Sequence, residues 1–320
     1  MRRSLNKEYR PLVYTRGTAF GKGQNAFFDG VLLNDGRTMF CPYASPNIGL
    51  YDYSTKTYTD GPSHGRGSMA FMGCEKLSDG RVVLSPNSSS NVGIYNPSTN
   101  QYTNGPAHGK GTNAFTGCAQ TNDGRVLFSP YLSADIVVYN ATSNTIASYG
   151  YTSGATGGAF SGAVNLGDGR ILLPPCTHPR IGLFDTISNV FVEGPAHGRG
   201  SAAFRGSMKL SDGRVLLLPY RNNNYCVFDP VTDAFTVTGT YLSGEHQYAG
   251  GITISDGRGV AIPYAALNFS VFDPVTNTVT TGASHGEGLY AFHGGVLQSD
   301  GTVTLVPCCS VYVGHLGYGA

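Results

Sequence analysis

Histidine recurs beside a charged residue in four short segments of this chain. The segments are PSHGRG (62–67), PAHGKG (106–111), PAHGRG (195–200) and ASHGEG (283–288). An imidazole, a cation and backbone N–H groups held together would suit an anion or a sugar. The same residues would also recur if they only formed the loop, and we favour that interpretation. The binding candidates in these segments are His64, Arg66, His108, Lys110, His197 and Arg199.

A metal site is not expected from these histidines. Zinc requires its ligands at about 2.1 Å from one centre, and the histidines lie in separate repeats. The chain also lacks the G-x-S-x-G, P-loop and H-E-x-x-H motifs. We therefore predict no catalytic residue, no metal and no cofactor.

Four tyrosines form a second candidate set. Each directly follows a proline that recurs with the repeat: Tyr43, Tyr131, Tyr220 and Tyr264. Tyr among Ser, Asn and Gly is typical of recognition surfaces. The alternative is that the rings only pack against a neighbouring repeat.

The elements that position these residues follow from a seven-fold repeat. An Asp-Gly pair begins at residues 35, 79, 123, 168, 212, 256 and 300, and Arg follows it in six copies. A period of about 40–50 residues is typical of propellers and solenoids. In the repeat from Gly67 to Gly111, the pattern predicts strands over 68–78, 81–86, 92–96 and 100–105. Asp79-Gly80 is expected to form a two-residue type I′ hairpin turn.

Four short strands per repeat and no helical periodicity describe one propeller blade. The fold class is therefore predicted as all-β: a seven-bladed β-propeller over residues 10–320, after a basic tail over 1–9. An aromatic residue eight positions before each Asp-Gly pair is expected to lie between blades. Residues 11–17 align with a fourth strand and should complete the blade of residues 289–317. Closure of this kind removes exposed sheet edges.

Strand alternation divides the ring into two faces. The Asp-Gly turns share one face with the Asp/Asn-Pro-x-Thr turns, while the variable loops share the other, which is the predicted binding face. Copies four and six break the loop motif with SGATGG (153–158) and SGEHQYAGG (243–251). Departures from a repeat can mark function, so Glu245 and His246 join the candidates.

Composition excludes several classes of protein. Charged residues are 13% of the chain and the formal net charge is +1, which argues against nucleic-acid binding. The basic start lacks the apolar stretch of a secretory signal, and no run reaches the ~18 apolar residues of a membrane span. The seven cysteines include no C-x-x-C pair, and Cys74 and Cys118 are expected to be apolar fillers.

The string LSDGRVLLLPY…VFDPVTDAFT (210–236) resembles kelch-type propeller repeats. The chain departs from them in having Pro where Gly-Gly usually ends the second strand, and in having no Trp. Copper oxidases of this fold need two Tyr, two His and a cross-linked Cys, and no such set can be placed here. The repeats GPAHGRG and PYxxxxVGIYDP are also similar to propellers of tailed-phage virion proteins.

These resemblances imply a non-enzymatic binding or assembly module of a phage tail or receptor-binding apparatus. The expected partners are other virion proteins or a cell-surface receptor or glycan, with no nucleic acid and no membrane insertion. The expected location is the virion, after synthesis in the host cytoplasm, or else the cytoplasm. A carbohydrate-active hydrolase or lyase and a lectin are the alternatives.

Overall fold

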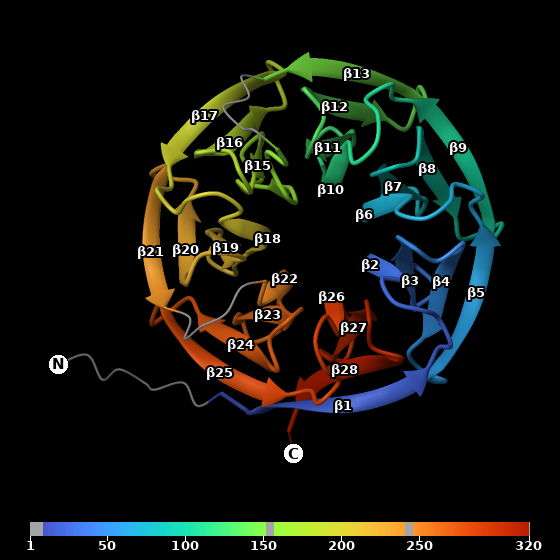
Figure 1. The fold of residues 1–320 in the computed structure, drawn as a ribbon, viewed down its shortest axis with the longest axis vertical. Helices are drawn as coiled ribbons and strands as arrows, with labels where there is room; N and C mark the ends of the chain where they lie inside the picture. Colours follow the sequence, from blue (N-terminus) through green and yellow to red (C-terminus); the bar gives the residue numbers. More distant parts are fainter. Residues whose placement is uncertain (1–8, 152–156, 241–245, 320) are drawn as a thin grey trace.

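Seven four-stranded antiparallel sheets are arranged around a central axis in the computed structural model (Figure 1). The structure describes residues 9–151, 157–240 and 246–319. Within these residues there is no helix, and so none that could cross a membrane. The prediction of an all-β, seven-bladed propeller is confirmed.

The first strand of each blade lies nearest the axis and the fourth lies on the outside (Figure 1). Blades 1 to 3 are β2 (Phe27–Leu32), β3 (Arg37–Pro42), β4 (Asn47–Asp52), β5 (Thr57–Ser63); β6 (Phe71–Lys76), β7 (Val82–Pro86), β8 (Asn91–Asn96), β9 (Gln101–Ala107); and β10 (Phe115–Gln120), β11 (Val126–Pro130), β12 (Asp135–Asn140), β13 (Thr145–Gly150). Blades 4 and 5 are β14 (Val164–Asn165), β15 (Arg170–Leu173), β16 (Arg180–Asp185), β17 (Val190–Ala196); and β18 (Phe204–Lys209), β19 (Val215–Pro219), β20 (Asn224–Asp229), β21 (Ala234–Thr240). Blades 6 and 7 are β22 (Tyr248–Thr253), β23 (Gly259–Pro263), β24 (Asn268–Asp273), β25 (Thr278–Ser284); and β26 (Phe292–Leu297), β27 (Val303–Pro307), β28 (Tyr312–Tyr318), β1 (Leu12–Ala19).

The aromatic residue that recurs at or just before each inner strand lies between two blades. Phe71 is fully buried and packs with Ile48 and Leu50 of blade 1 as well as Leu84 of its own blade. The predicted inter-blade role is confirmed. Strand β6 begins at this residue, later than the predicted residue 68, because residues 68–70 still belong to the loop.

Glycines follow the aromatic because the inner strands converge. A Cβ added to Gly73 would lie 2.6 Å from the Cα of Gly117 in the next blade. Gly73 also has a φ of 116°, and the β6–β7 register shifts between Phe71 and Cys74. Only glycine fits this combination of bulge and close approach.

The predicted type I′ turn at the Asp-Gly hairpin is wrong. Gly80 has a φ of 86°, but Asp79 is not in the left-handed region. The Gly80 N–H donates to the Leu77 carbonyl at 3.0 Å, and the Leu77 N–H donates to the Arg81 carbonyl at 2.8 Å. These bonds define a three-residue loop, in which Ser78 and Asp79 form the turn and Gly80 follows in the left-handed region.

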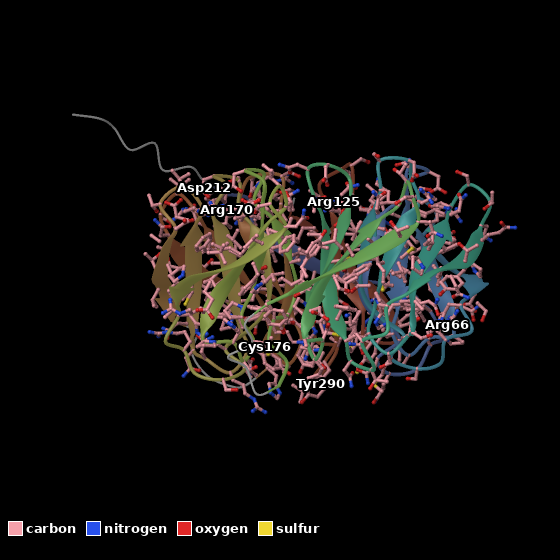
Figure 2. All side chains as sticks on the ribbon, turned by 90° about the horizontal axis from the view of Figure 1, so that it is seen from above. Arg66, Arg125, Arg170, Cys176, Asp212 and Tyr290 are labelled. Carbon is pink, nitrogen blue, oxygen red and sulfur yellow. The ribbon has the colours of Figure 1, made fainter. Side chains whose placement is uncertain are left out.

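The arginine after the Asp-Gly pair links neighbouring blades in five of the repeats, through Arg81, Arg125, Arg170, Arg214 and Arg258. In blade 5, Arg214 Nε donates to its own Asp212 at 2.7 Å. Its two terminal nitrogens donate to the carbonyl of Pro274 at 2.6 Å and to Asn277 Oδ1 at 2.7 Å, both in blade 6. Arg125, Arg170 and Asp212 lie on one face of the ring (Figure 2). We call this the turn face, and its repeated charges serve the scaffold.

The N-terminal strand completes the last blade. β1 pairs antiparallel with β28, with Tyr14 opposite Leu316 and Leu12 opposite Tyr318. Arg258 of blade 6 donates to the Arg10 carbonyl at 3.0 Å just before β1. The predicted closure by the N-terminal strand is thus present in the structure. At the next junction Thr302 replaces arginine, and Tyr53 of blade 1 donates to Asp300 at 2.9 Å instead.

Deletion of residues 1–17 is expected to destabilise the protein strongly, because blade 7 would lose its outer strand and expose the edge of β28. Thermal unfolding and light scattering should show a lower Tm and aggregation. Deletion of residues 1–8 is the control and should leave Tm within a few degrees of wild type. An unchanged melting curve for the longer deletion would contradict this account of closure.

Candidate functional site

The repeated loop histidines have both ring nitrogens occupied by the backbone. His108 Nε2 donates to the Ser89 carbonyl at 2.7 Å, and its Nδ1 accepts from the Lys110 N–H at 3.2 Å. His64, His197 and His285 make the equivalent pairs of bonds, and all four side chains are buried. Each imidazole therefore fastens its own loop, which supports the structural interpretation and leaves it no nitrogen for a ligand.

The cations of these loops are also engaged. Arg66 donates to Asn104 at 2.8 Å, Lys110 pairs with Asp135 at 2.6 Å, and Arg199 donates to Asn224 at 3.0 Å. Arg66 lies on the face opposite the turn face (Figure 2), which we call the loop face. These six predicted residues are distributed around the ring and do not converge on one site.

The residue after the recurring proline forms the rim of the central channel on the loop face. In each blade the N–H of this residue donates to the carbonyl of the residue before the inner-strand aromatic, at 2.8–2.9 Å. In six of the seven blades its carbonyl accepts from the corresponding N–H of the next blade, as between Tyr131 and Ala159 at 2.9 Å. Backbone bonds thus fix the seven rim positions: Tyr43, Asn87, Tyr131, Cys176, Tyr220, Tyr264 and Cys308. All four predicted tyrosines belong to this rim.

Arg205 lies among the rim tyrosines. Its Nη1 donates to the Tyr220 hydroxyl at 2.9 Å, and its guanidinium carbon lies 5.1 Å and 5.5 Å from the ring centroids of Tyr220 and Tyr264. The side chain is partly buried, and it forms no ion pair with any described residue. Of the guanidinium donors, only the one on Tyr220 has a partner in the described part of the chain.

A cavity of about 160 Å³ opens beside this guanidinium. It is lined by Tyr43, Met72, Asn87, Asn113, Thr116, Tyr131, Ser161, Cys176, Arg205 and Tyr220. The lining is therefore rich in hydroxyl and amide groups around one positive charge. We call this cavity and its rim the channel mouth.

Sequence reasoning missed Arg205, although the repeat contains a signal for it. The residue directly after the inner-strand aromatic varies from blade to blade: Phe28, Met72, Thr116, Ser161, Arg205, Ala249 and His293. These side chains lie on the channel side of the inner strands. Six of the seven line a cavity between the inner strands. Arg205 lines the adjoining cavity at the channel mouth together with Met72, Thr116 and Ser161. A single charge at a position that is otherwise uncharged is the exception that identifies the site.

His293 occupies the same repeat position in blade 7. Its Nδ1–H donates to the Phe28 carbonyl at 2.8 Å, and its Nε2 is buried without a hydrogen-bond partner among the described residues. Burial and the nearby Arg205 lower its pKa to about 3, so the ring is neutral. The Phe28 ring is stacked between the rings of His293 and Tyr43, with ring centroids 4.3 Å and 3.8 Å away.

Of the remaining candidates, His246 lies just before the inner strand of blade 6. His246 stacks on Tyr220 with ring centroids 4.3 Å apart, and Arg221 Nε lies 3.1 Å from its Nε2. It therefore extends the channel mouth outward. Glu245 lies outside the described residues.

Two carboxyl groups lie deeper along the channel. Asp29 stands where the other six blades have glycine, and it accepts N–H bonds from Gly30 at 2.8 Å and Cys74 at 3.1 Å. Burial raises its pKa to about 6. Burial, together with the nearby Asp29 charge, raises the pKa of Glu75 to about 7. The channel thus changes from a cation at its mouth to carboxyl groups within.

A metal centre does not fit the channel mouth. Among the described residues, no three His, Cys, Asp or Glu side chains are grouped to hold an ion. The Arg205 guanidinium would also repel a cation placed between the tyrosines. The arrangement suits an anion, which would neutralise the guanidinium and accept hydrogen bonds from its remaining N–H groups.

Comparison with known proteins reveals relationships at the level of the fold. No known family profile and no curated protein matches the sequence. A streptogramin B lyase structure has a TM-score of 0.81 at 15% identity, covering 96% of this chain and 98% of that one. A catalytically inactive histidine-to-alanine variant of virginiamycin B lyase from Staphylococcus aureus, with quinupristin, has a TM-score of 0.81 at 13% identity, covering 96% and 100%. A fungal alcohol oxidase of the AA5 family, in complex with copper, has a TM-score of 0.67 at 13% identity, covering 96% and 75%.

Replacing His108 by alanine is expected to lower the free energy of unfolding by about 2–4 kcal/mol, because two buried hydrogen bonds are lost. Burial lowers the pKa of His108 in the folded state. Its contribution is therefore complete above about pH 6.5, the unfolded value, and is lost as the pH falls below it. Urea unfolding at pH 8 and pH 5 should show a smaller difference between variant and wild type at pH 5. Gln101→Ala, an exposed control, should change stability little at either pH.

Glu75→Gln is expected to stabilise the protein at high pH, whereas His108→Ala is expected to destabilise it there. The raised pKa of Glu75 means that the contribution of this group to stability is complete below about pH 4.5, its unfolded value, and is lost as the pH rises through about 7. The neutral amide removes this loss, so the variant should gain on the order of 1–3 kcal/mol over wild type at pH 8. At pH 4.5 the two proteins should have similar stability. A gain that is equal at both pH values would contradict the assignment.

Proposed function

We propose that this protein is a ligand-binding propeller whose site is the channel mouth, and that its ligand carries a carboxylate on a sugar. The observation that carries the proposal is Arg205, a partly buried guanidinium without a carboxylate partner among the described residues. A charge in such surroundings is costly unless it is paired. The structural arginines of the turn face bond several acceptors, as Arg214 does with Asp212, Pro274 and Asn277.

The geometry favours a planar oxyanion. Arginine presents its N–H donors as a fork that matches both oxygens of a carboxylate. Tyr220 occupies one nitrogen and holds the group in place, so the other donors can face the cavity. Ordering the guanidinium before the ligand arrives lowers the entropy cost of binding.

The rest of the channel mouth suits the hydroxyl groups of a sugar ring. Tyr43 and Tyr131 present rigid rings with a polar end, and Asn113 and Ser161 add further polar groups. The cavity volume of about 160 Å³ matches one monosaccharide better than a long polymer. The lining and volume of the cavity therefore support our proposal of a glycan ligand on the variable face.

A second candidate function is a lyase acting on such a ligand. Two of the structures similar in fold are a streptogramin B lyase and a virginiamycin B lyase, and the histidine-to-alanine variant of the second is catalytically inactive. His293 is neutral, adjoins the channel mouth and has an Nε2 without a partner in the described chain. A pKa of about 3 makes it a weak base, so we place binding first.

The virion assignment stays a prediction from the resemblance to phage propellers, as do the virion partners and the location. None of the solved structures reported above is a phage protein. Co-purification of the protein with phage particles would support the virion proposal. Recovery only as free protein would count against it.

Arg205→Met tests the proposed site. Titration calorimetry with N-acetylneuraminate, glucuronate and galacturonate should show binding of at least one acid by wild type, and a loss of ten-fold or more in affinity for the variant. The neutral sugars glucose and galactose are the matched ligands and should bind weakly to both proteins.

The same variant separates a functional arginine from a structural one. Because Met removes an unpaired charge from the mouth, Arg205→Met should keep or raise Tm. A large fall in Tm, or equal binding of acidic and neutral sugars, would overturn the proposal. For the lyase candidate, an unsaturated product released from polygalacturonate, and lost in His293→Ala, would be the supporting result.

A further inference from the structure

Two adjacent cysteines lie on the rim of the channel mouth in blade 7. Cys308 is the rim residue that follows Pro307, and Cys309 is the next residue of the loop. Their sulfur atoms are 3.9 Å apart. The Asn25 carboxamide oxygen lies 3.4 Å from the Cys308 sulfur and 3.8 Å from the Cys309 sulfur, so one acceptor faces both thiols.

The two thiols have different surroundings. Cys308 is fully buried and packs with Phe28 and Met72, whereas Cys309 is partly exposed. Burial of the first sulfur and exposure of the second give them separate roles: a reagent from solvent reaches Cys309, and Cys308 lies directly behind it. The pair formed by Cys41 and Cys74 is buried at both residues, so it offers no such access.

We propose that Cys308 and Cys309 form an oxidisable dithiol site, in which Cys309 reacts with a hydroperoxide and Cys308 then closes a disulfide. The inference is independent of the proposed sugar site. A hydrogen bond from the Cys308 thiol lowers the pKa of Cys309 to about 6, which favours its thiolate at neutral pH.

The reaction balances with the hydroperoxide as the sole oxidant. The Cys309 thiol first loses its proton to water. The thiolate attacks the terminal oxygen of the hydroperoxide, the O–O bond breaks, and the alkoxide or hydroxide that leaves takes up the proton released by the thiol. Cys309 is then a sulfenic acid. The Cys308 sulfur attacks the Cys309 sulfur, the S–O bond breaks, and the departing hydroxide takes the Cys308 proton to form water. A dithiol reductant reverses the change by thiol–disulfide exchange.

Closing the bond changes the channel mouth. A disulfide requires the sulfurs to approach to about 2.05 Å, so the segment that carries both cysteines must rearrange against Phe28 and Met72. Tyr43 and Tyr264 pack against the same small cluster. Oxidation is therefore expected to alter the rim at these two tyrosines.

Mass spectrometry tests the proposal directly. Trypsin leaves Cys308 and Cys309 together on the peptide 259–320, which has no other cysteine. Full-length protein is treated with one equivalent of hydrogen peroxide at pH 7, denatured, alkylated and digested. The expected product is this peptide without alkyl groups on its two cysteines and with a mass about 2 Da below that of the reduced, unalkylated peptide. Cys41, Cys74 and Cys118 are expected to be alkylated.

Variants assign the two roles. Cys308→Ser should leave Cys309 as a sulfenic acid that dimedone traps, and Cys309→Ser should react no faster than the buried cysteines. Iodoacetamide added to folded wild-type protein should label Cys309 at least ten-fold faster than Cys118, a readout that needs no variant to fold. Equal labelling rates, disulfides between molecules, or over-oxidation of Cys309 in wild type without the internal disulfide would each overturn the proposal.

Discussion

The structure depends on contact between consecutive blades. A blade of four short strands has two apolar faces, and neither can be covered within the blade. The inner-strand aromatics, such as Phe71, fill the gap on the inside, and arginines such as Arg214 cross it on the turn face. Because each blade needs two neighbours, the series is stable only as a closed ring. This is why the chain places β1 beside β28.

The repeat made most of the fold predictable. Seven Asp-Gly pairs defined the register, and from that register came the strands, the two faces and the closure. The turn type was not predictable from Asp-Gly alone, because the preceding residue, Ser78, belongs to the turn and shifts the left-handed position to glycine. Local residue preference could not decide between these two loops.

The candidate site was harder to predict because its residues come together across the ring. The four tyrosines were found because they share one repeat position. Arg205 was missed since its neighbours Tyr264 and Tyr43 are distant in sequence, and no spacing records that inner strands converge. The histidines were found by their repetition, which reflects their bonds to the loop backbone, as His108 shows. Repetition therefore identifies the scaffold, and variation at equivalent positions identifies the site.

The rim offers seven equivalent backbone positions, yet its side chains differ, and only one of the seven adjoining inner-strand positions carries an arginine. A ring of identical side chains would accept a small ligand in seven rotational orientations. With one guanidinium on one side of the mouth and Cys308 on another blade, those orientations are no longer equal in energy. A bound molecule would therefore adopt one rotational orientation about the channel axis and present its remaining groups to a defined blade. The side chains of the propeller would in this way orient the ligand, although the backbone around the channel is almost seven-fold symmetric.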